Sequence, residues 1–213
     1  MKKLAIGCGV LVALGLIVLV IILIAGGSYN RLVRLAQQTD SAWAQVQTDY
    51  QRRMDLIPNL VATVSGAAHF EKSTLIQVTD ARASVGRVTV NSSAAPANAA
   101  QLAAFDQAQG QLSSALSRLL VVAERYPDLK SSANFLTLQA QLEGTENRIA
   151  VARRDFNDAV QQYDTAIKSF PAVFYAGAFG FREKPYFNAA PGAQTAPKVQ
   201  FDFSNAAPAP AKP

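Results

Sequence analysis

Apolar residues follow two distinct patterns along this chain. The first is a continuous run, because no charged residue lies among the 22 positions from Leu4 to Ala25. As a helix this run is about 33 Å long, close to the hydrocarbon thickness of a bilayer. We therefore predict a transmembrane helix over residues 4–27, after a short flank of residues 1–3. A secretory signal fits less well, because its apolar region spans only about 7–15 residues.

The second pattern is a heptad repeat. Three stretches, 29–85, 98–125 and 133–170, place apolar or small residues at alternating steps of three and four. This spacing is typical of long helices packed side by side, and short connections favour an antiparallel arrangement. The sequence thus predicts an all-α fold: a four-helix-bundle-like domain over residues 28–188, with three long helices and a short C-terminal aromatic segment. Residues 189–213, rich in Ala and Pro, are predicted to be disordered.

A proline interrupts the first heptad stretch within RRMDLIPNL, residues 52–60. In one account the helix breaks near Arg53, and Asp55 caps a new helix with Pro58 in its first turn. In the other account one helix continues and is kinked at Pro58, where the hydrogen bond to the Met54 carbonyl is lost. The heptad phase does not slip at this point, and no glycine lies in the segment, so the kinked helix is favoured.

Arg53 occupies a position on the heptad seam itself. A buried guanidinium needs a partner that balances its charge. The available carboxylates are Asp55 on the same helix and three residues of the third stretch, Glu143, Glu146 and Asp155. Alternatively, the side chain leaves the edge of the bundle and keeps its charge in water. We assign a structural role to Arg53, Asp55 and Pro58.

Aromatic residues are concentrated near the end of the domain. Seven of the 18 aromatic residues lie between Phe170 and Phe187. In one interpretation this segment is a lid that closes the bundle. In the other it is an interfacial segment that touches lipid or a partner protein. The residues assigned to the interfacial segment are Phe174, Tyr175, Phe179 and Phe181.

Charge and reactive side chains exclude several classes of function. The net charge is +5, but residues 28–170 hold 14 Lys and Arg against 13 Asp and Glu, so no basic patch argues for nucleic-acid binding. Cys8 is the only cysteine and His69 the only histidine, which excludes a cysteine-cluster metal site, a second histidine ligand and a cysteine nucleophile outside the predicted span. We predict that the protein is not an enzyme and holds no cofactor. A hydrolase that uses carboxylates of the bundle is the remaining alternative.

Several stretches of the chain resemble the LemA family of bacterial membrane proteins. They are AWAQVQTDYQRRMDLIPNLVATV (42–64), EKSTLIQVTDARA (71–83), YPDLKSSANFLTLQAQLEGTENRIAVARRDFNDAVQQYDTAIKSFP (126–171) and FGFREKPYF (179–187). The resemblance implies an N-terminal membrane anchor followed by an antiparallel helical bundle, with a loose connection to the cell envelope and to membrane organisation. It implies no known catalysis and supplies no catalytic residues.

The helix lengths suggest an uncovered surface. A continuous helix over residues 29–85 would be about 85 Å long, whereas the second and third helices would reach about 42 and 58 Å. The part of the first helix nearest the membrane would then lack a neighbour. Its seam residues, predicted to contact another copy or a partner, are Leu32, Trp43, Val46 and Tyr50. The alternative cover is the aromatic segment, residues 172–187, folded back on the helix.

Together these features favour a non-enzymatic, membrane-anchored helical scaffold that self-associates and organises the cell envelope or the membrane. The expected partners are membrane lipid, further copies of the chain and other envelope proteins. An adaptor or signalling module that binds another envelope protein is the alternative. Lys2 and Lys3 precede the predicted span, and Arg31 and Arg34 follow it. By the positive-inside tendency, we expect a single-pass protein of the bacterial cell membrane with the bundle outside the cytoplasm.

Overall fold

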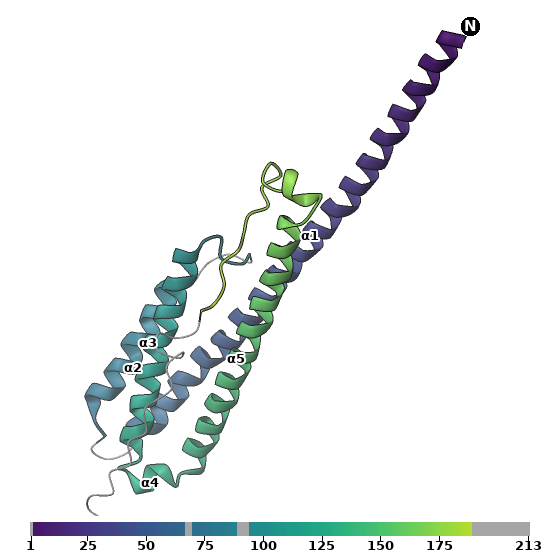
Figure 1. The fold of residues 1–213 in the computed structure, drawn as a ribbon. Helices are drawn as coiled ribbons and strands as arrows, with labels where there is room; N and C mark the ends of the chain where they lie inside the picture. The colour runs from purple at the N-terminus through teal and green to yellow at the C-terminus, as the bar shows by residue number, and fades with distance from the viewer. Residues whose placement is uncertain (1, 67–69, 89–93, 189–213) are drawn as a thin grey trace, which may run out of the picture.

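The computed structural model describes residues 2–66, 70–88 and 94–188. These residues form helices and no strand, as the all-α prediction requires (Figure 1). The elements in chain order are α1 (Lys2–Ser65), α2 (Lys72–Val88), α3 (Ala99–Ala123), α4 (Pro127–Lys130), α5 (Ala133–Lys168) and the 3₁₀ helix η1 (Ala172–Phe174). The tail predicted to be disordered lies outside the described residues.

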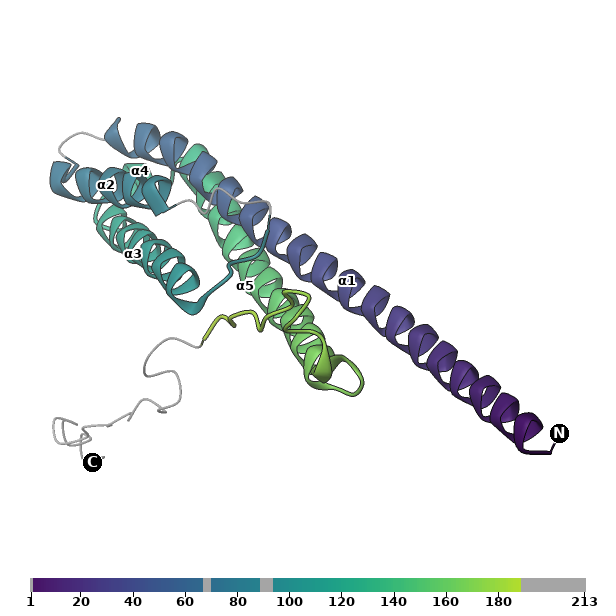
Figure 2. The ribbon, with the colours of Figure 1, turned by 90° about the horizontal axis from the view of Figure 1, so that it is seen from above.

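Four long helices run alternately down and up the bundle. Figures 1 and 2 show α1 entering the bundle from its long N-terminal extension, α2 returning beside α3, and α5 returning beside α1. Helix α1 packs mainly against α5, and α2 packs mainly against α3. The short helix α4 links the two pairs at the end of the bundle farthest from the N-terminus. The predicted antiparallel arrangement is therefore confirmed.

Local sequence signals set several helix ends. The Asn98 side chain accepts a hydrogen bond from the backbone N–H of Gln101 at 2.9 Å and caps α3. The Ser132 hydroxyl accepts one from the N–H of Phe135 at 3.4 Å and caps α5. Such caps satisfy N–H groups that have no partner inside the helix. Pro127 begins α4 and turns the chain between the last two long helices.

The prediction of three long helices is wrong, because the first heptad stretch forms two helices. Helix α1 ends at Ser65, and the chain reverses before α2 begins at Lys72. Gly66 follows the last residue of α1, and glycine is a poor helix former by about 1 kcal/mol relative to alanine. Both helices face one core, since Val64 and Val78 are buried in the same cluster, so each of them shows the same heptad spacing.

The expected length mismatch is also wrong. With α1 ending at Ser65, its part beyond the apolar segment, residues 28–65, is about 57 Å long, and the 36 residues of α5 give about 54 Å. The two helices therefore match in length.

Three apolar clusters follow one another along the bundle. The far cluster includes Ile57 and Leu112, the middle one Trp43 and Phe156, and the near one, closest to the apolar segment, Leu32 and Tyr163.

Helix α1 continues through Pro58, so the account in which the helix breaks at residues 53–55 is wrong. Proline has no N–H and leaves the carbonyl of Met54 without its helical donor. In the structure, Arg82 Nε of α2 donates a hydrogen bond to this carbonyl at 3.4 Å. The neighbouring helix α2 thus supplies a hydrogen-bond donor in place of the backbone N–H that proline lacks.

Replacing Pro58 with alanine should stabilise the bundle. The Pro58 side chain is exposed, so little packing is lost, and alanine restores the helical hydrogen bond. We expect the free energy of unfolding to rise by about 1–2 kcal/mol, less than the ~3 kcal/mol cost of an unsupported interior proline, because Arg82 already serves the Met54 carbonyl. Denaturant titration of the full chain in detergent measures the change. A loss of stability would show that proline at position 58 is needed for packing.

Candidate functional site

A buried polar cluster lies at the centre of the bundle, around Arg53. This side chain is 1% exposed. Its guanidinium donates hydrogen bonds to Glu146 Oε1 of α5 at 2.6 Å and to Ser113 Oγ of α3 at 2.8 Å. It also donates to the side-chain oxygen of Gln109, which is itself buried. Arg53 therefore joins three helices, and the account in which it extends into water is wrong.

Of the carboxylates considered as partners for Arg53, Glu146 is the one that pairs with it. Asp55 lies on the exposed side of α1, where it accepts a hydrogen bond from Gln51 Nε2 at 2.7 Å. Asp155 is exposed beside Arg154. Glu143 is exposed on α5. Asp55 thus has no part in the buried cluster, and these carboxylates do not gather around one cavity.

Tyr50 completes the cluster. The Arg53 guanidinium carbon lies 5.0 Å from the centre of the Tyr50 ring, within the range of a cation–π contact. Burial raises the pKa of the Tyr50 phenol, and the nearby Arg153 and Arg53 charges only partly oppose this. The phenol therefore stays protonated and neutral at pH 7, and the positive charge of Arg53 is balanced by Glu146.

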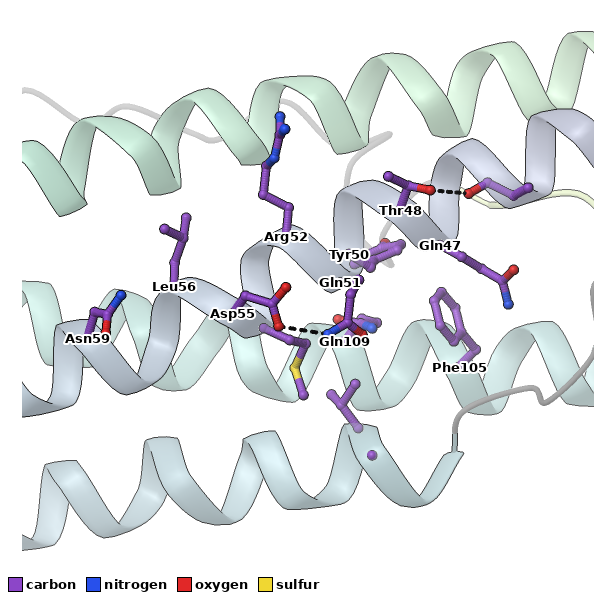
Figure 3. A pocket seen from close by; sticks show the side chains of 14 residues that line it. Gln47, Thr48, Tyr50, Gln51, Arg52, Asp55, Leu56, Asn59, Phe105 and Gln109 are labelled. Atoms are coloured by element: carbon purple, nitrogen blue, oxygen red, sulfur yellow. Dashed lines mark hydrogen bonds between the residues drawn. The ribbon is translucent and has the colours of Figure 1, made fainter.

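A groove of about 950 Å³ lies next to this cluster, between α1, the end of α2 and the start of α3 (Figure 3). Its apolar walls are formed by Tyr50, Met54, Leu56, Val85 and Phe105. Its polar rim includes Gln47, Thr48, Gln51, Arg52, Asp55 and Asn59. Gln109 lines the groove and also accepts the hydrogen bond from Arg53, so the cluster supports the groove wall.

The seam residues predicted to contact another chain are covered by their own chain. Leu32, Trp43, Val46 and Tyr50 are 1%, 0%, 0% and 4% exposed. The rings of Phe105, Phe156 and Phe187 surround Trp43 with centroid distances of 5.2, 5.5 and 6.1 Å. The premise of an uncovered seam is therefore wrong, because α5 and the C-terminal segment fill the space beside α1.

The C-terminal aromatic segment divides into two parts. Phe187 packs in the middle cluster, and Tyr175 and Phe181 pack against the near cluster, as a lid would. Phe174 and Phe179 point outward, with exposed fractions of 80% and 64%. Of the four residues assigned to the interfacial segment, two are therefore exposed on the surface and two are partly buried.

The hydrogen bonds that hold this segment were missed by sequence reasoning. Asn157 of α5 donates to the Phe187 carbonyl and accepts from the Phe187 N–H, both at 2.9 Å. Lys184 donates from its backbone to Asp164 at 3.1 Å and from its ammonium to Asp40 of α1 at 2.8 Å. Burial raises the pKa of the Asp164 carboxyl. These polar residues lie far apart in the chain, so no local pattern reveals the pairs.

Within residues 2–66, 70–88 and 94–188, no group of three or more His, Cys, Asp and Glu side chains is arranged to hold a metal ion. His69 lies outside the described residues. Within α1 from Leu14 onward, an 18-residue window has a mean hydropathy of 2.0 and only 6% of it is buried, so by length and composition this helix could cross a membrane.

Fold and site together define a class: an antiparallel four-helix bundle whose first helix extends into a candidate membrane span. The LemA family model matches residues 42–201, and the chain belongs to the LemA family.

The chain is similar to Magnetosome protein MamQ 2 of Paramagnetospirillum magneticum, with 28% identity over 182 residues. The match covers 78% of this chain and 67% of the relative. It is also similar to Magnetosome protein MamQ of Magnetospirillum gryphiswaldense, with 25% identity over 78% of this chain and 67% of the relative. Protein LemA of Metamycoplasma hominis is 23% identical over 68% of this chain and 61% of the relative.

Proposed function

We propose that this protein is a membrane-anchored helical scaffold of the bacterial cell envelope that acts by binding rather than by catalysis. The observation that carries the proposal is the continuity of α1. One helix, Lys2–Ser65, contains both the apolar segment and a central helix of the bundle. A bundle joined to its span without a flexible linker is held in a fixed relation to the membrane, which suits a protein that positions others.

The groove beside Arg53 is the binding surface in this proposal. Its apolar walls lie between three helices, and a helix laid into such a groove buries its apolar face. The glutamine and asparagine side chains of its rim can hydrogen-bond with a polar partner. We propose that a helix of a second copy fills the groove. Self-association would then use the groove instead of the seam residues, which the chain itself covers. An envelope protein of different sequence in the same groove would make the protein an adaptor.

The orientation of the protein is part of the same proposal. Lys2 and Lys3 stand before the apolar segment. Lysines beside a span are retained preferentially on the cytoplasmic side. We therefore propose a single span in the cell membrane with the bundle on the extracytoplasmic side.

Crosslinking from the groove tests the proposal. A photoreactive amino acid replaces Gln51, which lines the groove, in the full-length protein in its native membranes. The matched control replaces Arg154, whose side chain is 71% exposed on α5. We expect an adduct from position 51 and none from position 154, with the adduct mass measured by mass spectrometry.

The adduct mass separates the two candidate functions. A mass of two chains supports self-association through the groove. An adduct with a chain of different mass supports the adaptor. The scaffold proposal with this groove fails if position 51 yields no adduct, or if position 154 yields the same adducts in the same amounts.

A further inference from the structure

A cluster of large apolar side chains stands on the surface where the chain leaves α5. We call it the aromatic tip, and it consists of Phe170, Val173, Phe174 and Phe179. Phe170 and Phe174 are 79% and 80% exposed, and their rings contact each other edge to face at 6.0 Å. Large apolar side chains exposed together in one short segment are unusual on a surface that faces only water.

The tip is held in place by the backbone around it. The Phe181 N–H donates to the Ala176 carbonyl at 3.0 Å, and the Ala176 N–H donates to the Ala172 carbonyl at 2.8 Å. Both alanines are buried in the near cluster. Gly180 has a φ of 82°, a conformation that favours glycine, and it lets the chain reverse after Phe179. The outward position of the rings therefore follows from a fixed loop.

The tip lies beside the point where α1 leaves the bundle (Figure 1). The Tyr29 ring is 5.5 Å from the ring centres of both Phe179 and Phe181. Tyr29 comes four residues after Ala25, the last residue of the apolar run, which is about 6 Å along the helix. With the run spanning the hydrocarbon core, Tyr29 stands in the headgroup layer, which is several ångströms deep.

The side chains around the tip suit this layer. Aromatic rings are enriched at membrane–water interfaces, and basic residues accompany them there. Arg31, Arg34 and Arg182 are exposed near the same end of the bundle. Lys168 is exposed too and pairs with Glu183 at 2.8 Å.

We propose that the aromatic tip inserts into the interfacial layer of the leaflet from which α1 emerges. The bundle then touches the membrane at two points, the span and the tip, and both the distance and the rotation of its groove relative to the bilayer are set. This inference rests on the proposed function in one respect, namely that α1 crosses the membrane.

Fluorescence with brominated lipid tests the insertion. The Phe174→Trp variant of the full chain is reconstituted in phosphatidylcholine–phosphatidylglycerol vesicles, with or without bromine near the headgroup end of the acyl chains. The emission of buried Trp43 is measured on the unsubstituted protein and is subtracted from the emission of the variant. We expect about a twofold loss of the added emission in brominated vesicles, because an interfacial ring lies within contact of the bromine. The matched control is Val121→Trp, at an exposed position of α3 away from the tip, and its emission should not change.

Each outcome bears on one claim. Equal emission of Phe174→Trp with and without bromine overturns the insertion. A blue-shifted emission that bromine does not quench also overturns it, because the ring is then packed against protein. Vesicle flotation is measured on the same samples. Protein that fails to float with the vesicles contradicts the span and the proposed function, whereas protein that floats without quenching contradicts only the tip. Unchanged helical circular dichroism confirms that the variant is folded.

Discussion

Replacing Arg53 with alanine should lower the free energy of unfolding by about 3 kcal/mol. The side chain is 1% exposed, and its removal leaves a cavity among three helices. Gln109, also buried, loses the donor to its side-chain oxygen. Glu146 is less affected because its side chain is 46% exposed and water can replace the lost contact. The expected loss is therefore dominated by the cavity and by Gln109.

Denaturant titration of the full chain in detergent measures this loss, and the neighbouring Arg52→Ala provides the control. Arg52 is exposed, so its replacement should change stability by no more than about 0.5 kcal/mol. A double variant, Arg53→Met with Gln109→Leu, should recover most of the lost stability, because replacing both buried partners with apolar groups of similar size is often nearly neutral. Equal stability of the Arg52 and Arg53 variants would contradict the role of the cluster.

Replacing Trp43 with alanine should lower the free energy of unfolding by about 3–5 kcal/mol. The side chain is 0% exposed and fills the space between α1, α3, α5 and the C-terminal segment. Loss of the indole removes contacts with three phenylalanine rings at once, and the packed helices around it close the cavity only in part.

The Trp43→Phe variant distinguishes packing from hydrogen bonding. The indole Nε1 is buried, and no hydrogen-bond partner for it is present among the described residues. Phenylalanine keeps a ring in the same place and gives up no hydrogen bond, so we expect a loss of only about 1 kcal/mol. Circular dichroism follows unfolding here, because Trp43 is the single tryptophan of the chain. Equal losses for both variants would contradict the expectation that a phenylalanine ring preserves most of the packing.

Most of the fold follows from local patterns in the sequence. The charge-free run and the heptad steps depend on neighbouring residues, and apart from the turn after Ser65 the structure places long helices where these patterns predict them. The turn after Ser65 was missed for a physical reason. Two antiparallel helices that face one core show the same periodicity, and a heptad count carries no information on direction.

The candidate site was harder to predict because it depends on contacts between distant segments. A charge on the seam showed that Arg53 needed a partner, but not which carboxylate would reach it. Gln109 offered a usable signal, since it is a polar residue at a seam position of the second heptad stretch. In the aromatic segment, composition alone could not separate Phe181, which packs inward, from Phe179, which does not.

The unbroken course of α1 has a mechanical consequence. Spans tilt to match the thickness of the bilayer around them, by about 20° on average. A rigid helix that continues about 57 Å beyond the span would turn such a tilt into a sideways swing of about 20 Å at the far end of the bundle. Without the second contact at the aromatic tip, the same protein would lean by different amounts in thick and thin patches of membrane, and the groove beside Arg53 would meet neighbours at different heights above the lipid.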